Sequence, residues 1–330
     1  MPEDKKLRVA FIGCGGQATS NIYPHIASNP EMELVACCDL IEEKVRRNAE
    51  QFGAKAWYLD YEKMLDNEDV DAVFIVGHPH MHTELGIACL ERGYHVFTEK
   101  PTATNLADAK RLAETAERVG KFNQVGHMLP HGPATKLAVE VMASEEFGTP
   151  IFLESKYFVP GPRSAMPSWD APTLDWAYML VQSVHPVNWA MFMMGDIASL
   201  STKRGLGENG AVSYVVAVEF ANGASGLINL TSAAPFVVAE LEAVGDAGTF
   251  LHIDNMIRIR YQGGVWKEPQ VKDYGRREAG YSDEVVDFGR CILENKPTYP
   301  TFRDEYKALL VCQAIVDSIE TEKVISVPQE

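Results

Sequence analysis

The first apolar segment, Leu7-Arg8-Val9-Ala10-Phe11-Ile12, continues directly into Gly13-Cys14-Gly15-Gly16-Gln17-Ala18. This GxGxxA pattern predicts a strand, a tight glycine turn and the start of a helix. The first glycine permits the turn, the second lets the backbone approach a pyrophosphate, and the small Ala18 allows close helix–strand packing. Free N–H groups at the helix start bind phosphates. The sequence therefore predicts dinucleotide binding by Gly13, Gly15, Gly16, Gln17 and Ala18.

A second apolar strand, Met32–Cys38, follows at the distance expected of a βαβ unit and ends at Asp39. A carboxylate at this strand end accepts hydrogen bonds from the adenosine ribose hydroxyls. It also repels a 2′-phosphate, and the next two residues are aliphatic and offer no cation. Arg46 and Arg47 lie further along the following helix. We therefore expect NAD in preference to NADP.

Helical and apolar segments alternate from Asp39 to residue 126. The predicted helices cover residues 42–52, 83–92 and 105–119, and the predicted strands cover residues 70–76, 94–98 and 121–126. Alternation of this kind predicts a parallel sheet covered on both faces. The expected fold class is α/β, with a doubly wound Rossmann domain that binds the dinucleotide over residues 1–126.

The pattern changes after residue 126. A connecting helix is predicted at residues 132–143, a helical insertion at 176–194 and terminal helices at 282–294 and 303–320. Alternating β-branched segments predict strands at 151–159, 212–220, 224–231, 238–244 and 256–261. We expect an α+β domain over residues 127–330, with a large, mostly antiparallel sheet that serves substrate binding and oligomerisation. A sheet with one face left open needs cover, so we expect a homodimer or homotetramer.

Composition excludes several classes of protein. The 330 residues carry a net charge of −16, whereas nucleic acids and anionic membrane surfaces attract basic proteins. No apolar run reaches the roughly 18 residues that cross a bilayer, and we expect a cytoplasmic protein. The six cysteines are scattered, without CxxC or zinc spacing, which indicates reduced, buried thiols.

The tripeptide Glu99-Lys100-Pro101 ends the apolar segment at residues 94–98. Lys-Pro at a strand end is commonly an ordinary turn. Here it follows the fifth strand of a dinucleotide-binding domain, where a lysine would lie at the nicotinamide end of the cofactor. We expect all three residues to contribute to the cofactor site.

The glycine loop, Asp39, the tripeptide and an antiparallel second domain occur in this order along essentially the whole chain, which resembles the Gfo/Idh/MocA oxidoreductase family. The resemblance implies NAD(P)-dependent hydride transfer between nicotinamide and a secondary alcohol or ketone of a sugar, sugar derivative or inositol-like polyol. It also implies that Lys100 orients substrate and nicotinamide, and that the Lys100–Pro101 bond is cis. The segment at residues 77–84 resembles a family loop and places His78 and His82 near the cofactor.

The family's second-domain signature is Asp, three residues, His, and a further Asp three residues later. Residues 181–188 keep the histidine, His185, but both aspartates are missing. We expect His185 to be the base that removes the hydroxyl proton, since its ordinary pKa of about 6.5 suits proton exchange near neutrality. Lys100 would stabilise the developing alkoxide. From the residues alone, a buried helix histidine with satisfied hydrogen bonds is the more common interpretation of His185.

Further side chains could line the substrate pocket, although each also fits a core or surface position: His127, Arg163, Trp169, Asp175, Tyr178 and Gln182. Three histidines at residues 78, 80 and 82 invite a metal interpretation, but no nearby cysteine or carboxylate set completes a tetrahedral shell. We expect no metal site.

The missing aspartates leave two alternatives to a dehydrogenase. The chain could be a catalytically silent protein that binds NAD or a sugar and regulates a partner, because fold does not fix function. It could also be an enzyme that uses transient oxidation by NAD to enable elimination or hydrolysis.

Overall fold

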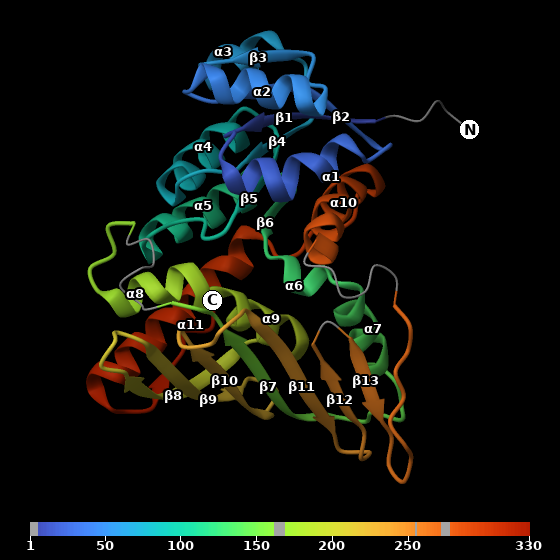
Figure 1. Cartoon of the computed structure of the whole chain (residues 1–330), viewed down its shortest axis with the longest axis vertical. Helices are drawn as coiled ribbons and strands as arrows, with labels where there is room; N and C mark the ends of the chain where they lie inside the picture. The colour runs from blue at the N-terminus through green and yellow to red at the C-terminus, as the bar shows by residue number, and fades with distance from the viewer. Residues whose placement is uncertain (1–5, 162–168, 255, 272–277) are drawn as a thin grey trace. The chain divides into compact units, whose positions relative to one another are not determined.

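The computed structural model describes residues 6–161, 169–254, 256–271 and 278–330 (Figure 1). The chain forms two compact units. Unit 1 comprises Met1–Met128 and Gly280–Tyr306, and unit 2 comprises Leu129–Ala279 and Lys307–Glu330. The assignment of separate functions to residues 1–126 and 127–330 stays a prediction.

Unit 1 contains the predicted doubly wound sheet. Its six strands are parallel and lie in the order β3-β2-β1-β4-β5-β6. This order places the topological switch point between β1 and β4, where α/β sheets of this kind bind ligands. The strands are β1 (Leu7–Ile12), β2 (Met32–Cys38), β3 (Ala56–Tyr58), β4 (Ala72–Ile75), β5 (His95–Glu99) and β6 (Asn123–Gly126).

Helices cover this parallel sheet, and one of them comes from the far end of the chain. In α10, Phe288 packs edge-on against Phe74 at 5.4 Å between ring centroids. A Cβ on Gly289 would lie 2.1 Å from Met32 Cε, so this helix packs directly against β2. The helical segments are η1 (Ala18–Ile22), α1 (Tyr23–Ala27), α2 (Glu42–Phe52), α3 (Tyr61–Asn67), α4 (Pro79–Glu91), α5 (Leu106–Val119) and α10 (Glu278–Glu294).

Helix α4 begins earlier than residue 83, where the sequence predicted its start. Pro79 occupies the first turn and His78 the N-cap. Proline is well suited to this position because its fixed φ is helical and the N–H that it lacks would have no helical partner. The end of the predicted loop at residues 77–84 is therefore helical.

Unit 2 contains the predicted large sheet. Its order is β13-β12-β11-β7-β10-β9-β8-β14, and all neighbours are antiparallel except β7 and β10. The sequence did not predict β8, β12 or β14. The strands are β7 (Pro150–Phe158), β8 (Ile197–Leu206), β9 (Val212–Phe220), β10 (Ser225–Thr231), β11 (Val238–Gly245), β12 (Phe250–Ile253), β13 (Ile257–Arg260) and β14 (Ile325–Ser326).

Helices lie on one face of this second sheet, behind the strands in Figure 1. Ser155 on β7 donates to the carbonyl of Pro186 at 3.4 Å, and Thr202 N donates to Ser318 Oγ at 2.9 Å. The remaining helical segments are α6 (Met128–His131), α7 (Pro133–Met142), α8 (Leu174–Tyr178), η3 (Met179–Ser183), α9 (Val184–Met194) and α11 (Phe302–Thr321). The boundary between the units falls within α11.

All six cysteines are free thiols, and five of them are buried. Among the described residues, no helix is both long and apolar enough to span a membrane. The cytoplasmic location stays a prediction.

Candidate active site

The glycine loop after β1 combines one sterically obligatory glycine with two that leave open space. Gly13 has a φ of +104°, and a Cβ there would lie 2.0 Å from the carbonyl oxygen of Val76. A Cβ on Gly15 or Gly16 would meet no atom within 4 Å. The loop therefore presents bare backbone at the switch point of the sheet, which fits the close approach of a pyrophosphate.

Asp39 is fixed at the end of β2 by two backbone donors. Its Oδ2 accepts from Cys14 N at 2.7 Å and its Oδ1 accepts from Ile41 N at 2.9 Å. An ionised carboxylate offers about four acceptor positions, so the two ribose hydroxyls can still be accommodated. The nearby arginines have protein partners, since Arg46 contacts Glu42 at 3.3 Å and Arg47 donates to the carbonyl of Cys14 at 3.5 Å.

His82 joins the start of α4 to the Lys100–Pro101 segment, whose peptide bond is cis. Its Nε2 accepts from Gly77 N at 3.1 Å, so the ring proton is on Nδ1, which donates to Pro101 O at 2.8 Å. Burial lowers the pKa of His82 to about 4. The imidazole is therefore neutral at physiological pH and acts as a link between two loops.

The other two histidines of this loop are exposed, and the rings of His78 and His80 stack at 5.2 Å. His82 uses both ring nitrogens within the protein. Across the described parts of the chain, no group of three or more His, Cys, Asp or Glu side chains is arranged to hold a metal ion.

Glu99 and Lys100 are consecutive residues, an acid and a base, at the end of β5. Glu99 is buried, and its carboxylate accepts from Gln17 Nε2 at 2.8 Å and from Lys100 N at 3.1 Å. Burial lowers the pKa of Lys100, and the charges of Glu99 and Glu305 oppose that fall. The structure thus brings together the predicted residues Gln17, Glu99 and Lys100. Glu305 is a further acid whose charge acts on Lys100, and the sequence did not indicate it.

Two buried glutamates lie among these groups, and the sequence analysis missed both. Glu305 Oε2 lies 2.7 Å from His127 Nε2, and both side chains are buried. Glu284 is also buried; burial raises its pKa far above the ordinary value, and the charge of Glu99 adds to the increase. Each acid follows an aromatic residue by three positions on an otherwise apolar helix face, Phe302 and Tyr281 respectively. A carboxylate within an apolar stripe is the signal that could have identified them.

His185, the candidate base in unit 2, is on α9 with 6% of its surface exposed. Its ring lies 5.3 Å from that of Tyr157, with 32° between the planes. Tyr178 is fully buried, and burial raises the pKa of its hydroxyl. Gln182 lies in η3 and is partly buried. His185 is therefore buried beside an aromatic ring.

The other predicted substrate residues lie in separate environments. The carboxylate of Asp175 accepts from Tyr214 Oη and pairs with Arg204. Trp169 is partly exposed and has a φ of +43°, and Arg163 lies outside the described residues. His127 belongs to unit 1, where Glu305 is its partner.

Two family models match the chain. The NAD-binding Rossmann fold of the GFO/IDH/MocA oxidoreductase family matches residues 7–127, and the GFO/IDH/MocA C-terminal domain matches residues 135–251. Myo-inositol 2-dehydrogenase of Thermotoga maritima is 24% identical, over 98% of this chain and 99% of its own length. The scyllo-inositol 2-dehydrogenase (NAD(+)) of Bacillus subtilis is 25% identical, over 89% of this chain and 88% of its own length.

The fold is also found among solved structures. Levoglucosan dehydrogenase in complex with NADH superposes with a TM-score of 0.87 at 20% identity, covering 99% of this chain and 100% of that one. The glycine loop, the Lys100–Pro101 segment and strands β7–β11 of the second sheet lie in the regions that the two family models match. The chain belongs to the GFO/IDH/MocA family of oxidoreductases with an NAD-binding Rossmann fold.

Proposed function

We propose that this protein is an NAD-dependent dehydrogenase or reductase that acts on a secondary alcohol or ketone of a sugar, sugar derivative or inositol-like polyol. The observation that carries the proposal is the position of Lys100 next to the buried carboxylate of Glu99, at the end of β5. The open glycine loop follows β1, a strand of the same parallel sheet. The names of the two inositol dehydrogenases support the polyol class.

NAD is the proposed cofactor, and when bound it supplies the hydride acceptor or, once reduced, the donor. Backbone N–H groups at Gly15 and Gly16 would hold its phosphates, and Asp39 would hold the ribose. Asp39 would also repel the 2′-phosphate of NADP, since Arg46 and Arg47 already have protein partners. The Asp39→Ala variant should therefore bind NADP more tightly relative to NAD, and an unchanged ratio of the two affinities would contradict the assignment.

Two side chains carry the proposed chemistry. His185 takes the hydroxyl proton of the substrate as hydride leaves its carbon, and the Lys100 ammonium stabilises the alkoxide. Tyr178, Gln182 and Trp169 are the proposed substrate contacts in unit 2. The corresponding roles of Arg163, Asp175 and His127 stay predictions.

The experiment that tests this function follows nicotinamide absorbance of the purified protein with NAD or NADP and a panel of sugars, sugar acids and inositols. We expect NAD reduction with at least one polyol, and its loss in His185→Ala. Absence of turnover with the whole panel, while NADH still binds, would contradict the dehydrogenase and favour the regulatory or internal-redox alternatives.

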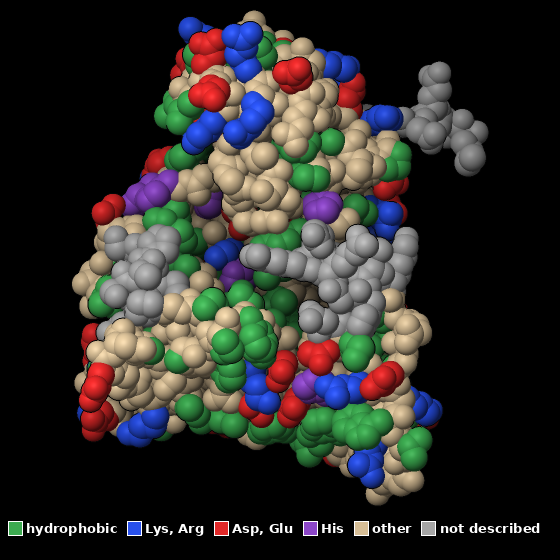
Figure 2. All heavy atoms as spheres, viewed as in Figure 1, with side chains coloured by type: hydrophobic (Ala, Val, Ile, Leu, Met, Phe, Trp, Pro, Cys, Tyr) green, Lys and Arg blue, Asp and Glu red, His purple; other side chains and the backbone are tan. Residues whose placement is uncertain are grey.

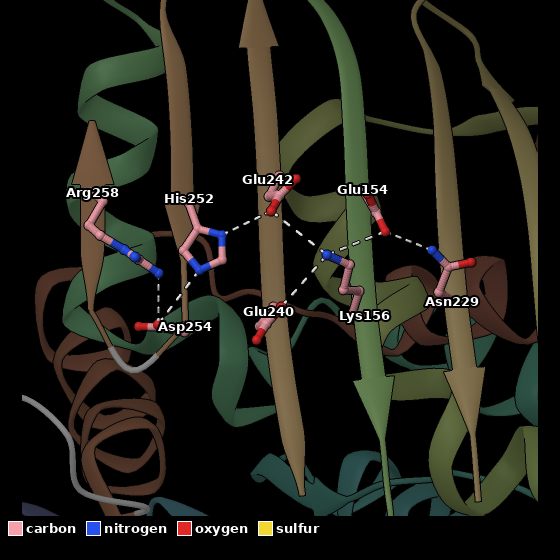
Figure 3. A network of polar contacts seen from close by, with 8 residues as sticks. All are labelled: Glu154, Lys156, Asn229, Glu240, Glu242, His252, Asp254 and Arg258. Carbon is pink, nitrogen blue, oxygen red and sulfur yellow. Dashed lines mark hydrogen bonds and ion pairs between the residues drawn. The ribbon is translucent and has the colours of Figure 1, made fainter. Parts of the chain in front are cut away.

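Homo-oligomerisation through the sheet of unit 2 is also proposed. The face without helices carries a polar network across β7 and β10–β13 (Figure 3), and Figure 2 shows charged and histidine side chains gathered there. Lys156 lies 3.5 Å from Glu154 and 3.7 Å from both Glu240 and Glu242. His252 contacts Glu242 at 3.1 Å.

These charges find partners within the sheet, so a second copy could cover the face without leaving unpaired ions. The exposed apolar side chain of Val215 on β9 lies on the same face, because Val215 is paired with Asn229 and Asn229 is paired with Lys156. Sedimentation at micromolar concentration should show a dimer or tetramer, and a pure monomer would contradict the proposal.

A further inference from the structure

The side chain of Gln17 joins the glycine loop to the end of β5. Gln17 Nε2 donates to Glu99 Oε1 at 2.8 Å, and Asn21 Nδ2 on η1 donates to Gln17 Oε1 at 2.7 Å. Both polar groups of this side-chain amide therefore make hydrogen bonds within the protein. The side chain of a residue that the sequence assigned to the dinucleotide is directed toward the acid that precedes Lys100.

Glu99 extends this contact to Lys100 through the second oxygen of its carboxylate. Glu99 Oε2 accepts from the backbone N–H of Lys100 at 3.1 Å. Only 4% of the surface of Glu99 is exposed, and a Cβ on Gly126 would lie 3.2 Å from its Cδ. Burial raises the pKa of Glu99, while the charge of Lys100 and the hydrogen bond from Gln17 oppose that rise. The carboxylate is therefore held on one side by the glycine loop and on the other by the Lys100 backbone.

The contact crosses the switch point of the parallel sheet. β4 lies between β1 and β5, and neighbouring strands are about 4.8 Å apart, so the ends of β1 and β5 are about 10 Å apart. Gln17 and Glu99 together span this gap with side chains. A displacement of about 1 Å at a reacting group can lower a rate by about a hundredfold, so a fixed distance between the glycine loop and Lys100 has a direct use in catalysis.

Stability alone gives a weaker account of this bridge. Gln17 is exposed as a whole, and water can solvate an exposed amide in its place, so its hydrogen bonds add little to the free energy of unfolding. The acid that it contacts is buried and lies next to the lysine that carries the proposed chemistry. Loss of the bridge should therefore change the order of the Lys100 backbone more than the stability of the fold.

We propose that Gln17 is a positioning residue for hydride transfer: through the Glu99 carboxylate, it fixes the backbone of Lys100 relative to the glycine loop. The catalytic meaning of this inference rests on the proposed dehydrogenase function. The bridge itself does not, because the exchange of the Lys100 N–H with solvent reports its state without any turnover.

The experiment measures hydrogen exchange at the Lys100 amide by NMR of protein that carries isotopically labelled lysine, with Lys100→Met identifying the signal. Gln17→Met keeps the length of the side chain and cannot donate. Exchange should become about tenfold faster in this variant, the lower end of what a hydrogen bond to a charged group contributes. An unchanged exchange rate in Gln17→Met would overturn the proposal.

Gln51→Met is the matched control, because it makes the same replacement at an exposed glutamine of unit 1, on α2. Exchange at Lys100 should stay at the wild-type rate in this variant. An increase equal to that of Gln17→Met would show a general loosening of unit 1 and would also overturn the proposal.

Exchanging the two partners tests whether the contact itself matters. Gln17→Glu alone places two carboxylates against each other and should give faster exchange at Lys100 than the wild type. Combined with Glu99→Gln, the same change restores a donor and an acceptor in reversed order, and the new amide oxygen can still accept from Lys100 N. Exchange in the double variant should therefore return toward the wild-type rate. A double variant that exchanges as fast as Gln17→Glu would overturn the proposal.

Turnover separates positioning from cofactor binding. With an active polyol, kcat should fall about tenfold in Gln17→Met, while KM for the polyol and the affinity for NADH stay unchanged. Weaker NADH binding with a wild-type kcat would show that Gln17 only holds the dinucleotide, and would overturn the proposal. If the wild type turns over no substrate, the dehydrogenase function fails, while the exchange rates still decide whether Gln17 fixes Lys100.

Discussion

The two units hold their candidate catalytic side chains by different means. In unit 1, Lys100 donates its backbone N–H to Glu99, a buried acid that also accepts a hydrogen bond from Gln17. In unit 2, His185 lies on a buried helix beside the ring of Tyr157. Charge controls the first residue and aromatic packing the second, so substitutions in the two units should produce different signatures.

The largest expected effects come from the two candidate catalytic residues. Lys100→Met and His185→Ala should each lower kcat by about two orders of magnitude or more, the range for a positioned proton-transfer or charge-stabilising group. NADH affinity should stay nearly unchanged in both, as measured by fluorescence titration beside steady-state kinetics.

Exposed residues of the same types provide the controls for this pair of variants. Lys63→Met and His80→Ala alter exposed side chains and should leave kcat close to the wild-type value. Wild-type activity in either Lys100→Met or His185→Ala would remove that residue from the mechanism and leave one unit without its proposed role.

Substitutions at two glycines of the same loop, Gly13 and Gly15, should affect different properties: the first stability and the second cofactor binding. Gly13→Ala should lower the free energy of unfolding by at least about 3 kcal/mol, because the new Cβ meets the carbonyl of Val76 and the φ is positive. Gly15→Ala meets no protein atom, so it should unfold like the wild type in urea but bind NADH more weakly. Equal stability of both variants would contradict the geometry of this loop.

His82 should make the stability of unit 1 depend on pH. Its pKa is about 4 in the folded protein and about 6.5 when unfolded. Below about pH 6.5 the unfolded chain binds the extra proton first, so the stability contribution is complete at neutral pH and is lost as pH falls toward 4. The free energy of unfolding in urea should be about 2 to 3 kcal/mol lower at about pH 4.5 than at about pH 7.5 because of His82 alone.

The control for this prediction is His82→Gln, which has no titrating ring. It should be less stable at neutral pH, because the links to Gly77 and Pro101 are altered, and it should lose that part of the pH dependence. The same pH dependence in variant and wild type would show that other groups cause it.

Much of the fold could be predicted from local sequence pattern. β1 and β2 have the predicted bounds because each is a mostly apolar run, interrupted by a single charged residue, between turn residues. β8 was missed because its second half, ending in Lys203-Arg204-Gly205-Leu206, is exposed and shows no apolar alternation. β3 has only three residues, too few for a periodic signal.

The candidate site was predicted where backbone geometry requires particular residues. Gly13, whose φ is positive, leaves such a trace in the sequence, whereas the cis Lys100–Pro101 bond was expected only from the resemblance to the family. The partnership of His127 and Glu305 leaves no such trace, because 178 positions separate the two residues and only tertiary folding brings them together. Contacts between side chains that are distant in the sequence leave no short-range pattern, so they cannot be predicted from the sequence of one chain.

The smallest expected effect concerns Asp175 in unit 2. Its carboxylate accepts a hydrogen bond from Tyr214 and pairs with Arg204, and its side chain is 13% exposed. Asp175→Asn should therefore lower the free energy of unfolding by about 1 kcal/mol, the scale of a partly exposed ion pair, and leave KM for the polyol unchanged. If KM rises tenfold while stability is unaltered, Asp175 contacts substrate, and charge as well as aromatic packing would control the chemistry of unit 2.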